Sequence, residues 1–215
     1  MNKTKKAIIF GANAQAEVVA YLLDVDSEYE VQAFCISAAY REGDSFYDKP
    51  LVDFETIENV YPPSEYEMYV SLSYADQNKV RERFYHEAKE KGYTLLTYIS
   101  SRTTNYAKSI GDNCFIFEDN TIQPFVEIGN NVILWSGNHI GHHSIVEDNC
   151  FISSHVVISG LCRIGANSFL GVNSTLRDGM TLGKYNTLGA GCLMVKNTED
   201  DKIFIGTKST EYVKK

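Results

Sequence analysis

Four of the five histidines in this sequence stand close together, at positions 139, 142, 143 and 155. A neutral imidazole near pH 7 can take a proton from an attacking amine or hydroxyl, so the cluster is a candidate for general-base catalysis. Imidazoles are also common zinc ligands, and a histidine at a turn is often simply solvated. These three interpretations stay open until the elements that carry the histidines are known.

The histidines lie inside a six-residue repeat that runs from Ile110 to Leu193 without an insertion or deletion. Every hexad in this range begins with Ile, Leu or Val, and the fifth residue is mostly small. A period of six fits neither an α-helix nor simple strand alternation. It is the signature of a parallel β-helix, in which short strands and tight turns stack in coils. With three hexads to a coil and a ladder spacing of about 4.8 Å, the repeat predicts a prism roughly 24 Å tall.

The register of the repeat decides which side chains point inward. First and fifth positions are expected to face the interior, so the cysteines at fifth positions are expected to be small core residues rather than nucleophiles or ligands. Asn120 and Asn138 share one fifth-position column and are expected to form an inward amide ladder. The four histidines fall at turns or on the outer face. The fifth-position cysteines are Cys114, Cys150, Cys162 and Cys192.

The first 97 residues show a different pattern. A strand at 7–10 is followed by a glycine turn and a helix, and further strands are expected at 31–36, 68–72 and near 93–99. A helix of about 16 residues is expected to begin at an Asp76 cap and to stop at Gly92. Strands that alternate with helices predict a small parallel, Rossmann-like α/β domain over residues 1–97, followed by a β-helix domain over residues 98–215.

The turn after the first strand is a candidate phosphate site, because backbone N–H groups at a helix N-terminus attract anions. The dinucleotide fingerprint is weak: Asn13 and Ala16 replace its later glycines, and Ser37 stands where an acid is expected after the second strand. A mononucleotide site is therefore favoured over NAD. A turn that only starts the helix remains the alternative.

The composition excludes several classes of function. The net charge of −8 argues against general binding of nucleic acid or of an anionic membrane. No stretch approaches the roughly 20 apolar residues of a membrane span. Five cysteines without a CxxC motif fit a reducing compartment, so a cytoplasmic location is expected.

The whole chain resembles the bacterial nucleotide-sugar acyltransferases of the sialic-acid O-acetyltransferase type, which include the sugar N-acetyltransferases of bacillosamine and perosamine synthesis. The resemblance rests on the first turn, GANAQAEVV at 11–19, and on the hexad that begins at Ile140 with His142 in its third position. It implies a left-handed β-helix, an acyl-CoA co-substrate, a nucleotide sugar, a homotrimer and a role in polysaccharide biosynthesis such as that of the O-antigen. A metal is not expected, because the β-helical carbonic anhydrases separate two zinc ligands by five residues and no histidine pair here has that spacing.

The resemblance also implies roles for individual residues. His142 matches the family's base, while His143 stands where the family has an acid that orients the base. The family's second histidine falls at Phe151, and His155 is a candidate substitute. The expected catalytic residues are His142, His143 and His139. The expected cofactor-binding residues are His155, Gly171, Gly189, Ala190 and Lys196. The expected substrate-binding residues are Gly11, Asn13, Ala14, Gln15, Ser37 and Asn138.

The function implied is transfer of an acyl group, with acetyl-CoA as the first donor to test, to an amino group on a nucleotide-linked deoxysugar. The amine, expected at carbon 4, attacks the thioester directly with a histidine as general base. Two alternatives stay open: O-acylation of a sugar hydroxyl, and a non-catalytic trimer that binds sugar nucleotides.

Overall fold

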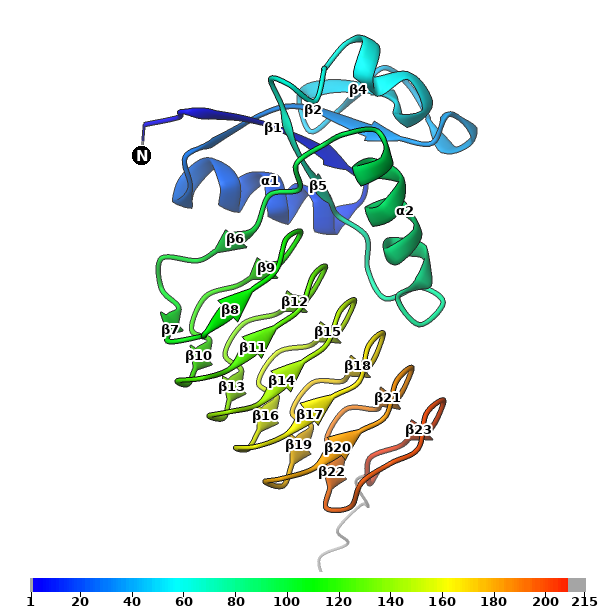
Figure 1. The fold of residues 1–215 in the computed structure, drawn as a ribbon. Helices are drawn as coiled ribbons and strands as arrows, with labels where there is room; N and C mark the ends of the chain where they lie inside the picture. Colours follow the sequence, from blue (N-terminus) through cyan, green and yellow to red (C-terminus); the bar gives the residue numbers. More distant parts are fainter. Residues whose placement is uncertain (1, 209–215) are drawn as a thin grey trace, which may run out of the picture.

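The structure, a computed structural model, describes residues 2–208, so the last seven residues of the predicted second domain lie outside it. An α/β part sits on top of a long three-sided prism (Figure 1). No helix within residues 2–208 has the length and apolar character needed to cross a membrane.

The α/β part is built on a five-stranded sheet. Its strands are β1 (Lys5–Phe10), β2 (Tyr29–Ile36), β3 (Ser45–Phe46), β4 (Lys49–Asp53) and β5 (Glu67–Val70), in the order β3-β4-β2-β1-β5. All pairs are parallel except the β3–β4 hairpin. Helix α1 (Ala14–Asp26) covers one face and helix α2 (Lys79–Glu90) covers the other, together with the 3-10 turn η2 (Phe54–Asn59). A second 3-10 turn, η1 (Ala38–Tyr40), follows β2.

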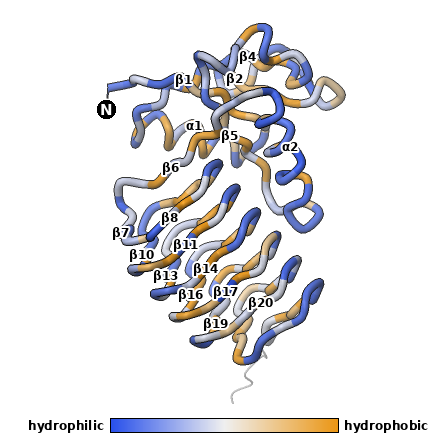
Figure 2. The backbone as a smooth tube through the Cα atoms, viewed as in Figure 1, coloured by the Kyte–Doolittle hydropathy of each residue, from blue (hydrophilic) through white to orange (hydrophobic). Residues whose placement is uncertain are grey.

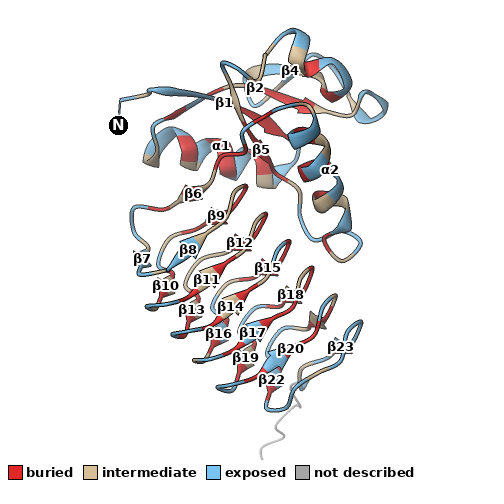
Figure 3. Ribbon diagram, viewed as in Figure 1, coloured by how far each residue is buried: buried red, intermediate tan, exposed pale blue. Residues whose placement is uncertain are grey.

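Alternate residues of β1 serve the two faces, which is why its apolar run can support two helices. Ala7 and Ile9 join the core under α1, whereas Ile8 and Phe10 join the core under α2. Figure 3 shows β1 and β5 buried between the helices.

Three features of this part differ from the sequence-based expectation. Helix α2 begins at Lys79 with Asn78 as its N-cap rather than at an Asp76 cap, because Asp76, Gln77 and Asn78 all have a left-handed φ of 47–64°. The expected strand near 93–99 splits: Leu95 makes an isolated bridge to Met68, and β6 (Tyr98–Ile99) pairs with the prism instead. The β3–β4 hairpin was not predicted.

The prism has three parallel faces, each with one short strand per coil. Strands from β8 to β22 pair with the strand 18 residues away, whereas the spacing is 17 residues where β6 and β7 join the top coil and 16 residues between β21 and β23. Face 1 consists of β6, β9 (Phe115–Ile116), β12 (Ile133–Leu134), β15 (Phe151–Ile152), β18 (Phe169–Leu170), β21 (Thr187–Leu188) and β23 (Ile203–Phe204). Face 2 consists of β7 (Thr104–Asn105), β10 (Thr121–Ile122), β13 (His139–Ile140), β16 (Val157–Ile158), β19 (Thr175–Leu176) and β22 (Leu193–Met194). Face 3 consists of β8 (Ser109–Ile110), β11 (Glu127–Ile128), β14 (Ile145–Val146), β17 (Arg163–Ile164) and β20 (Thr181–Leu182).

We call the turns between faces 3 and 1 corner A, those between faces 1 and 2 corner B, and those between faces 2 and 3 corner C. Residues 111–114, 117–120 and 123–126 are early examples of the three corners. Figure 2 shows hydrophobic segments recurring at the strands of successive coils.

The interior follows the predicted register. First-position side chains from Ile116 to Leu188 are buried in one continuous core, and the four fifth-position cysteines lie with them. All five cysteines of the chain are buried and free of disulfides, and burial raises the pKa of the Cys150 thiol to about 12. The predicted amide ladder is also present: the Asn120 Oδ1 accepts from the Asn138 N–H at 3.1 Å, and the Asn138 Oδ1 accepts from the Val156 N–H at 2.8 Å.

The fourth position of every hexad from 110 to 193 has a left-handed φ. Asn, Asp and Gly adopt this conformation most easily, and they fill most of the column. Larger residues there cost roughly 1–2 kcal/mol each. Five of them nevertheless occupy it and therefore invite a functional explanation: Phe125, His143, His155, Leu161 and Tyr185.

The α/β part is fixed to corner A by a fully buried arginine on α2. The Arg81 Nε donates to the Asn131 Oδ1, its Nη1 donates to the Asn78 Oδ1 and the Ser73 carbonyl, and its Nη2 donates to the Asn149 carbonyl at 2.8 Å. Burial lowers the pKa of Arg81 to about 10, so the guanidinium stays charged near pH 7. A column of asparagine side chains, linked amide to amide from Asn113 through Asn131 to Asn149, forms the seat. This seat holds α1 over face 1 of the upper coils.

Candidate active site

The turn between β1 and α1 has the geometry of an anion site. Gly11 has a φ of 126°, and a Cβ there would lie 2.6 Å from the Ser71 carbonyl oxygen, so only glycine fits. The Asn13 Oδ1 caps α1 by accepting from the Ala16 N–H at 3.0 Å. Within the described residues the N–H groups of Ala14 and Gln15 make no hydrogen bond, which leaves them available to an anion.

Ser71 lies beside this turn with its side chain fully buried. Its hydroxyl has no hydrogen-bond partner in the part of the chain that the structure describes. An unpaired buried hydroxyl costs about 1–3 kcal/mol, which a polar ligand or a bridging water at the turn would recover.

A carboxylate that was not predicted from the sequence lies at the end of β2. Glu55, in η2, accepts from the Ala38 N–H at 3.0 Å, next to Ser37. Because β4 runs parallel to β2, residues that follow the two strands meet at the same edge of the sheet. The acids after β4 were the available signal, but the sequence alone does not show that β4 is the neighbour of β2.

Aromatic side chains form a wall on face 1 below α1. Tyr74, in the loop after β5, lies 4.5 Å from Phe169 and 5.2 Å from Phe151 between ring centroids, and it is half-exposed. Phe117 and Trp135 stack at 4.3 Å and line an open groove of about 450 Å³ beneath the exposed side of α1. Phe151 is therefore part of an apolar surface, and Tyr74 is a wall residue that sequence reasoning missed.

His142 and His143 form a pair at corner C. Their Nδ1 atoms are 3.1 Å apart, and their rings are nearly perpendicular. Gln123 in the turn above accepts the His142 backbone N–H through its Oε1 at 2.8 Å, and the Phe125 ring lies 4.6 Å from the His143 ring. No carboxylate of residues 2–208 forms an ion pair with either imidazole.

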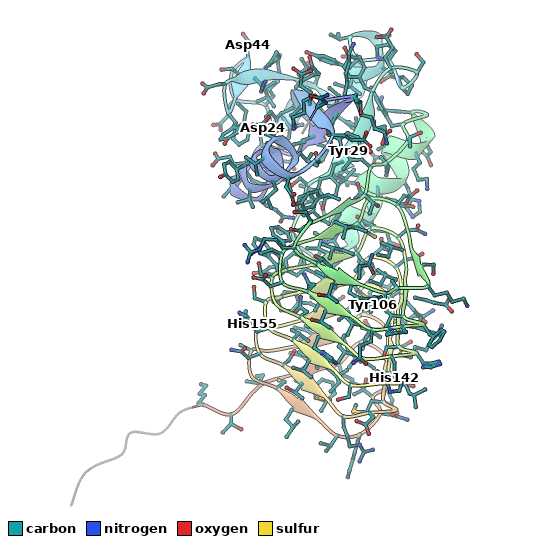
Figure 4. All side chains as sticks on the ribbon, turned by 90° about the vertical axis from the view of Figure 1, so that its left-hand side faces the viewer. Asp24, Tyr29, Asp44, Tyr106, His142 and His155 are labelled. Atoms are coloured by element: carbon teal, nitrogen blue, oxygen red, sulfur yellow. The ribbon has the colours of Figure 1, made fainter. Side chains whose placement is uncertain are left out.

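The other two histidines lie elsewhere on the prism. His139 is on β13 in face 2, half-buried, with Thr121 and Val157 as its neighbours in the sheet. His155 is at corner B, where its ring packs over Gly137. Figure 4 shows His142 and His155 at opposite sides of the prism. Within residues 2–208, no group of three or more His, Cys, Asp or Glu is placed to hold a metal ion.

The expected cofactor-binding residues share corner B, with one exception. Gly171, Gly189 and Ala190 stack there below His155, and a Cβ on Gly171 would lie 2.7 Å from the Ala190 nitrogen. Close packing of successive turns therefore explains this glycine without a ligand, and both uses are compatible. Lys196 lies at corner C of the last coil and is exposed.

Asn138 is inside the prism rather than at a binding surface. It is almost fully buried, and its amide bonds to the Trp135 carbonyl and the Val156 N–H. Its amide is used by the ladder, so the structure favours that role over the expected contact with substrate.

A single chain does not bring the anion turn between β1 and α1, the aromatic wall, the corner B glycines and His142 together in one site. The anion turn and the aromatic wall lie over face 1, the glycines expected to bind the cofactor follow corner B, and His142 lies at corner C, across face 2 from them.

Sequence models of two related repeat families match the prism. The model of the bacterial transferase hexapeptide (six repeats) matches residues 108–142 and 128–160, and that of the hexapeptide repeat of succinyl-transferase matches residues 162–193.

Solved structures share the fold over almost the whole chain. The acetyltransferase domain of PglB from Neisseria gonorrhoeae FA1090 in complex with acetyl coenzyme A is 23% identical, with a TM-score of 0.83 over 94% of this chain and 97% of that one. PerB from Caulobacter crescentus in complex with CoA and GDP-perosamine is 20% identical, with a TM-score of 0.83 over 94% of both chains. WeeI from Acinetobacter baumannii AYE is 15% identical, with a TM-score of 0.80 over 94% and 97%. The predicted fold class, a Rossmann-like domain followed by a left-handed parallel β-helix, is confirmed.

Proposed function

We propose that this chain is an acyl-CoA-dependent N-acyltransferase that acts on an amino group of a nucleotide-linked deoxysugar. One observation carries the proposal: a free helix N-terminus suited to phosphate and an exposed histidine suited to base catalysis are held on one hexapeptide scaffold. The fold neighbours support it, because one holds acetyl coenzyme A and another holds CoA with GDP-perosamine.

The proposed chemistry needs no covalent enzyme intermediate. The amine nitrogen attacks the thioester carbonyl carbon, a C–N bond forms and the C–S bond breaks. The proton lost by the amine passes to the Nε2 of His142 and then to the departing CoA sulfur. Most of the rate would come from holding both substrates in an attack geometry.

The acceptor would bind across the α/β part and face 1. Its phosphates would meet the N–H groups of Ala14 and Gln15, with the buried hydroxyl of Ser71 nearby. The nucleoside would extend toward the sheet edge at Ser37 and Glu55. The sugar would lie over the wall formed by Tyr74 and its aromatic neighbours.

The acyl-CoA would run along corner B beside His155, Gly171, Gly189 and Ala190. Lys196, at corner C of the last coil, would contact the cofactor bound by a neighbouring chain. Glycines at corner B leave room for an extended ligand to approach the backbone closely.

The site would be completed by a second copy of the chain in a closed threefold trimer. Rotation about an axis parallel to the prism keeps every residue at its height, and one hexad rises about 1.6 Å if a coil rises about 4.8 Å. The turn of His142 therefore stands about one hexad below the corner B turn of Trp135 and two above that of His155. A neighbouring chain would place its His142 at a height between the Trp135 turn and the His155 turn of corner B. Phe125 and Leu161, exposed by 59% and 61% at corner C, would be covered by the same contact.

The test follows CoA release from acetyl-CoA with 4-amino and 3-amino sugar nucleotides and with their hydroxyl counterparts. Turnover of the amino sugars is expected. Turnover of the hydroxyl sugars alone would support O-acylation, and binding without any turnover would support the non-catalytic trimer.

The base is tested by His142→Ala, which should lower kcat by roughly 10²–10⁴ while CoA binding persists. His86→Ala is the matched control, because His86 is an exposed histidine on α2, in the α/β part and not at corner B or C. Wild-type turnover in His142→Ala would remove His142 from the mechanism.

A further inference from the structure

The partner of the catalytic base is itself a histidine. A base of this kind is usually oriented by a carboxylate or a backbone carbonyl that accepts its second N–H. Here the only polar side-chain contact of the His142 ring within residues 2–208 is the Nδ1 of His143, at 3.1 Å. We propose that His143 is a positioning residue that fixes the tautomer of His142. This inference rests on the proposed function.

The distance between the two nitrogens restricts the tautomers. A hydrogen bond between two Nδ1 atoms needs a proton on one and a lone pair on the other, and a neutral imidazole has a single N–H. If His142 carries its proton on Nδ1, its Nε2 is free to receive a proton, and His143 must carry its own proton on Nε2. In the reverse arrangement the His143 Nδ1 donates to the His142 Nδ1. The His142 proton is then on Nε2, so that this nitrogen cannot accept a proton from the amine.

The reaction itself selects the productive arrangement. When the His142 Nε2 takes the amine proton, the ring becomes an imidazolium with a proton on both nitrogens. Only a neutral His143 with a bare Nδ1 can accept the charged donor, and a hydrogen bond from a charged donor is stronger than a neutral one. The pair therefore favours the charged state of His142 that the transition state requires.

His143 is held in place before substrate arrives. Its backbone has a left-handed φ of 59°, its N–H donates to the Pro124 carbonyl, and its ring lies against Phe125. The contact of Gln123 with the His142 backbone fixes the other half of the pair. A side chain fixed in this way can orient a base without loss of freedom during the reaction.

The two turns packed above and below the pair carry no charged side chain. The turn above consists of Gln123, Pro124, Phe125 and Val126, and the turn below of Ser159, Gly160, Leu161 and Cys162. The one titratable side chain among them is the Cys162 thiol, whose pKa is raised by burial. His139, on the adjacent strand β13, makes no hydrogen bond to either ring within the described residues.

Three substitutions at one position test the proposal. In His143→Asn the Oδ1 can take the place of the Nδ1 as acceptor, and asparagine tolerates the left-handed turn. His143→Leu removes the acceptor, and Leu161, one coil away in the same column with a φ of 62°, shows that leucine fits this turn. His143→Asp supplies a charged acceptor.

We expect His143→Asn to keep kcat within about threefold and His143→Leu to lose roughly 10- to 100-fold in kcat, with the KM for acyl-CoA unchanged. His143→Asp should move the acid limb of the pH–rate profile upward by about one unit, because a carboxylate stabilises the imidazolium. Equal kcat in His143→Leu and wild type, equal losses in the Leu and Asn variants, or an unmoved acid limb would each overturn the positioning role.

A readout without turnover separates this inference from the proposed function. Imidazole ¹⁵N chemical shifts of the intact protein at pH 8 should show His142 protonated on Nδ1 and His143 on Nε2. In His143→Leu, His142 should become a mixture of tautomers. Turnover with His142 protonated on Nε2 would overturn the inference alone. The expected tautomers without thioester turnover on any acceptor would overturn the proposed function and, with it, the catalytic purpose of the pair.

Discussion

Gly160 offers a way to move His142, the proposed base, without removing it. The His142 ring lies over this glycine, so that a Cβ at position 160 would stand 2.8 Å from both the Cε1 and the Nε2 of the ring. Ordinary contacts of a Cβ are 3.4–4 Å, and the Gly160 backbone itself accepts an L-residue, so Gly160→Ala should displace the ring rather than the turn.

The size of the effect follows from that distance. Restoring ordinary contact requires a movement of about 0.6–1.2 Å, and an error of about 1 Å in a reacting group costs roughly 10² in rate. We expect Gly160→Ala to lower kcat by roughly 10- to 100-fold. The free energy of unfolding should change by less than about 1 kcal/mol, because the turn is at the surface.

The assay is steady-state release of CoA, with circular dichroism melting as the check on folding. Gly179→Ala is the matched control: it lies one coil below in the same corner, it has no atom within 4 Å of a new Cβ, and its φ of 68° makes it the more strained change. Gly160→Ala should therefore be the less active and the more stable variant. Full activity in Gly160→Ala, in a protein whose His142→Ala variant is inactive, would refute the assigned position of the ring.

Three further predictions concern stability, assembly and the thiols. Arg81→Met should lower the free energy of unfolding in urea by about 2–6 kcal/mol, because the backbone carbonyls of Asn131 and Asn149 both accept from the Arg81 Nη2 and would lose that donor at about 1–3 kcal/mol each. Arg83→Ala, exposed on the same helix, should change the free energy of unfolding by less than about 0.5 kcal/mol. Light scattering should find a trimer that Phe125→Glu dissociates with loss of activity, and an active monomer would contradict the shared site. All five cysteines should react with Ellman's reagent at pH 8 only after unfolding, because burial keeps them protonated and inaccessible; a fast native thiol would contradict the core assignment.

The prism was predictable because its physics is local and repeated. One apolar residue in six, with small residues at the fifth positions, is sufficient to define the coils, the buried cysteines and the Asn120–Asn138 ladder.

The α/β part was predictable only in outline. The start of α2 was missed because three consecutive left-handed residues precede it, and nothing in their types requires that conformation. The division of the chain between residues 97 and 98 stays a prediction.

The candidate site was predictable in its residue types and not in its arrangement. His139 and His142 are three positions apart, which is half a hexad, so one lies on a face and the other at a corner. Arg81 and its asparagine seat were missed because the contact joins residues about 50 positions apart in sequence. Glu55 was missed for a different reason: it is 17 positions from Ala38, and their meeting depends on the order of the strands in the sheet. The separation of the base from the anion turn becomes visible only when the corners are placed around one axis.

The Arg81 seat sets the height of the α/β part along the axis of the prism. The seat fixes the α/β part at the coils of Asn131 and Asn149, and the His142 turn belongs to a coil at the same level. A whole coil of 18 residues inserted between the seat and the His142 turn would leave the stacked core intact and would shift the α/β part relative to His142 by about 4.8 Å. On the proposed function, the length of acceptor that reaches His142 would therefore change only in steps of one coil. Fine adjustment of that length would fall to loops of the α/β part such as the one that carries Tyr74, which contacts Phe169 and is followed by the left-handed residues Asp76, Gln77 and Asn78.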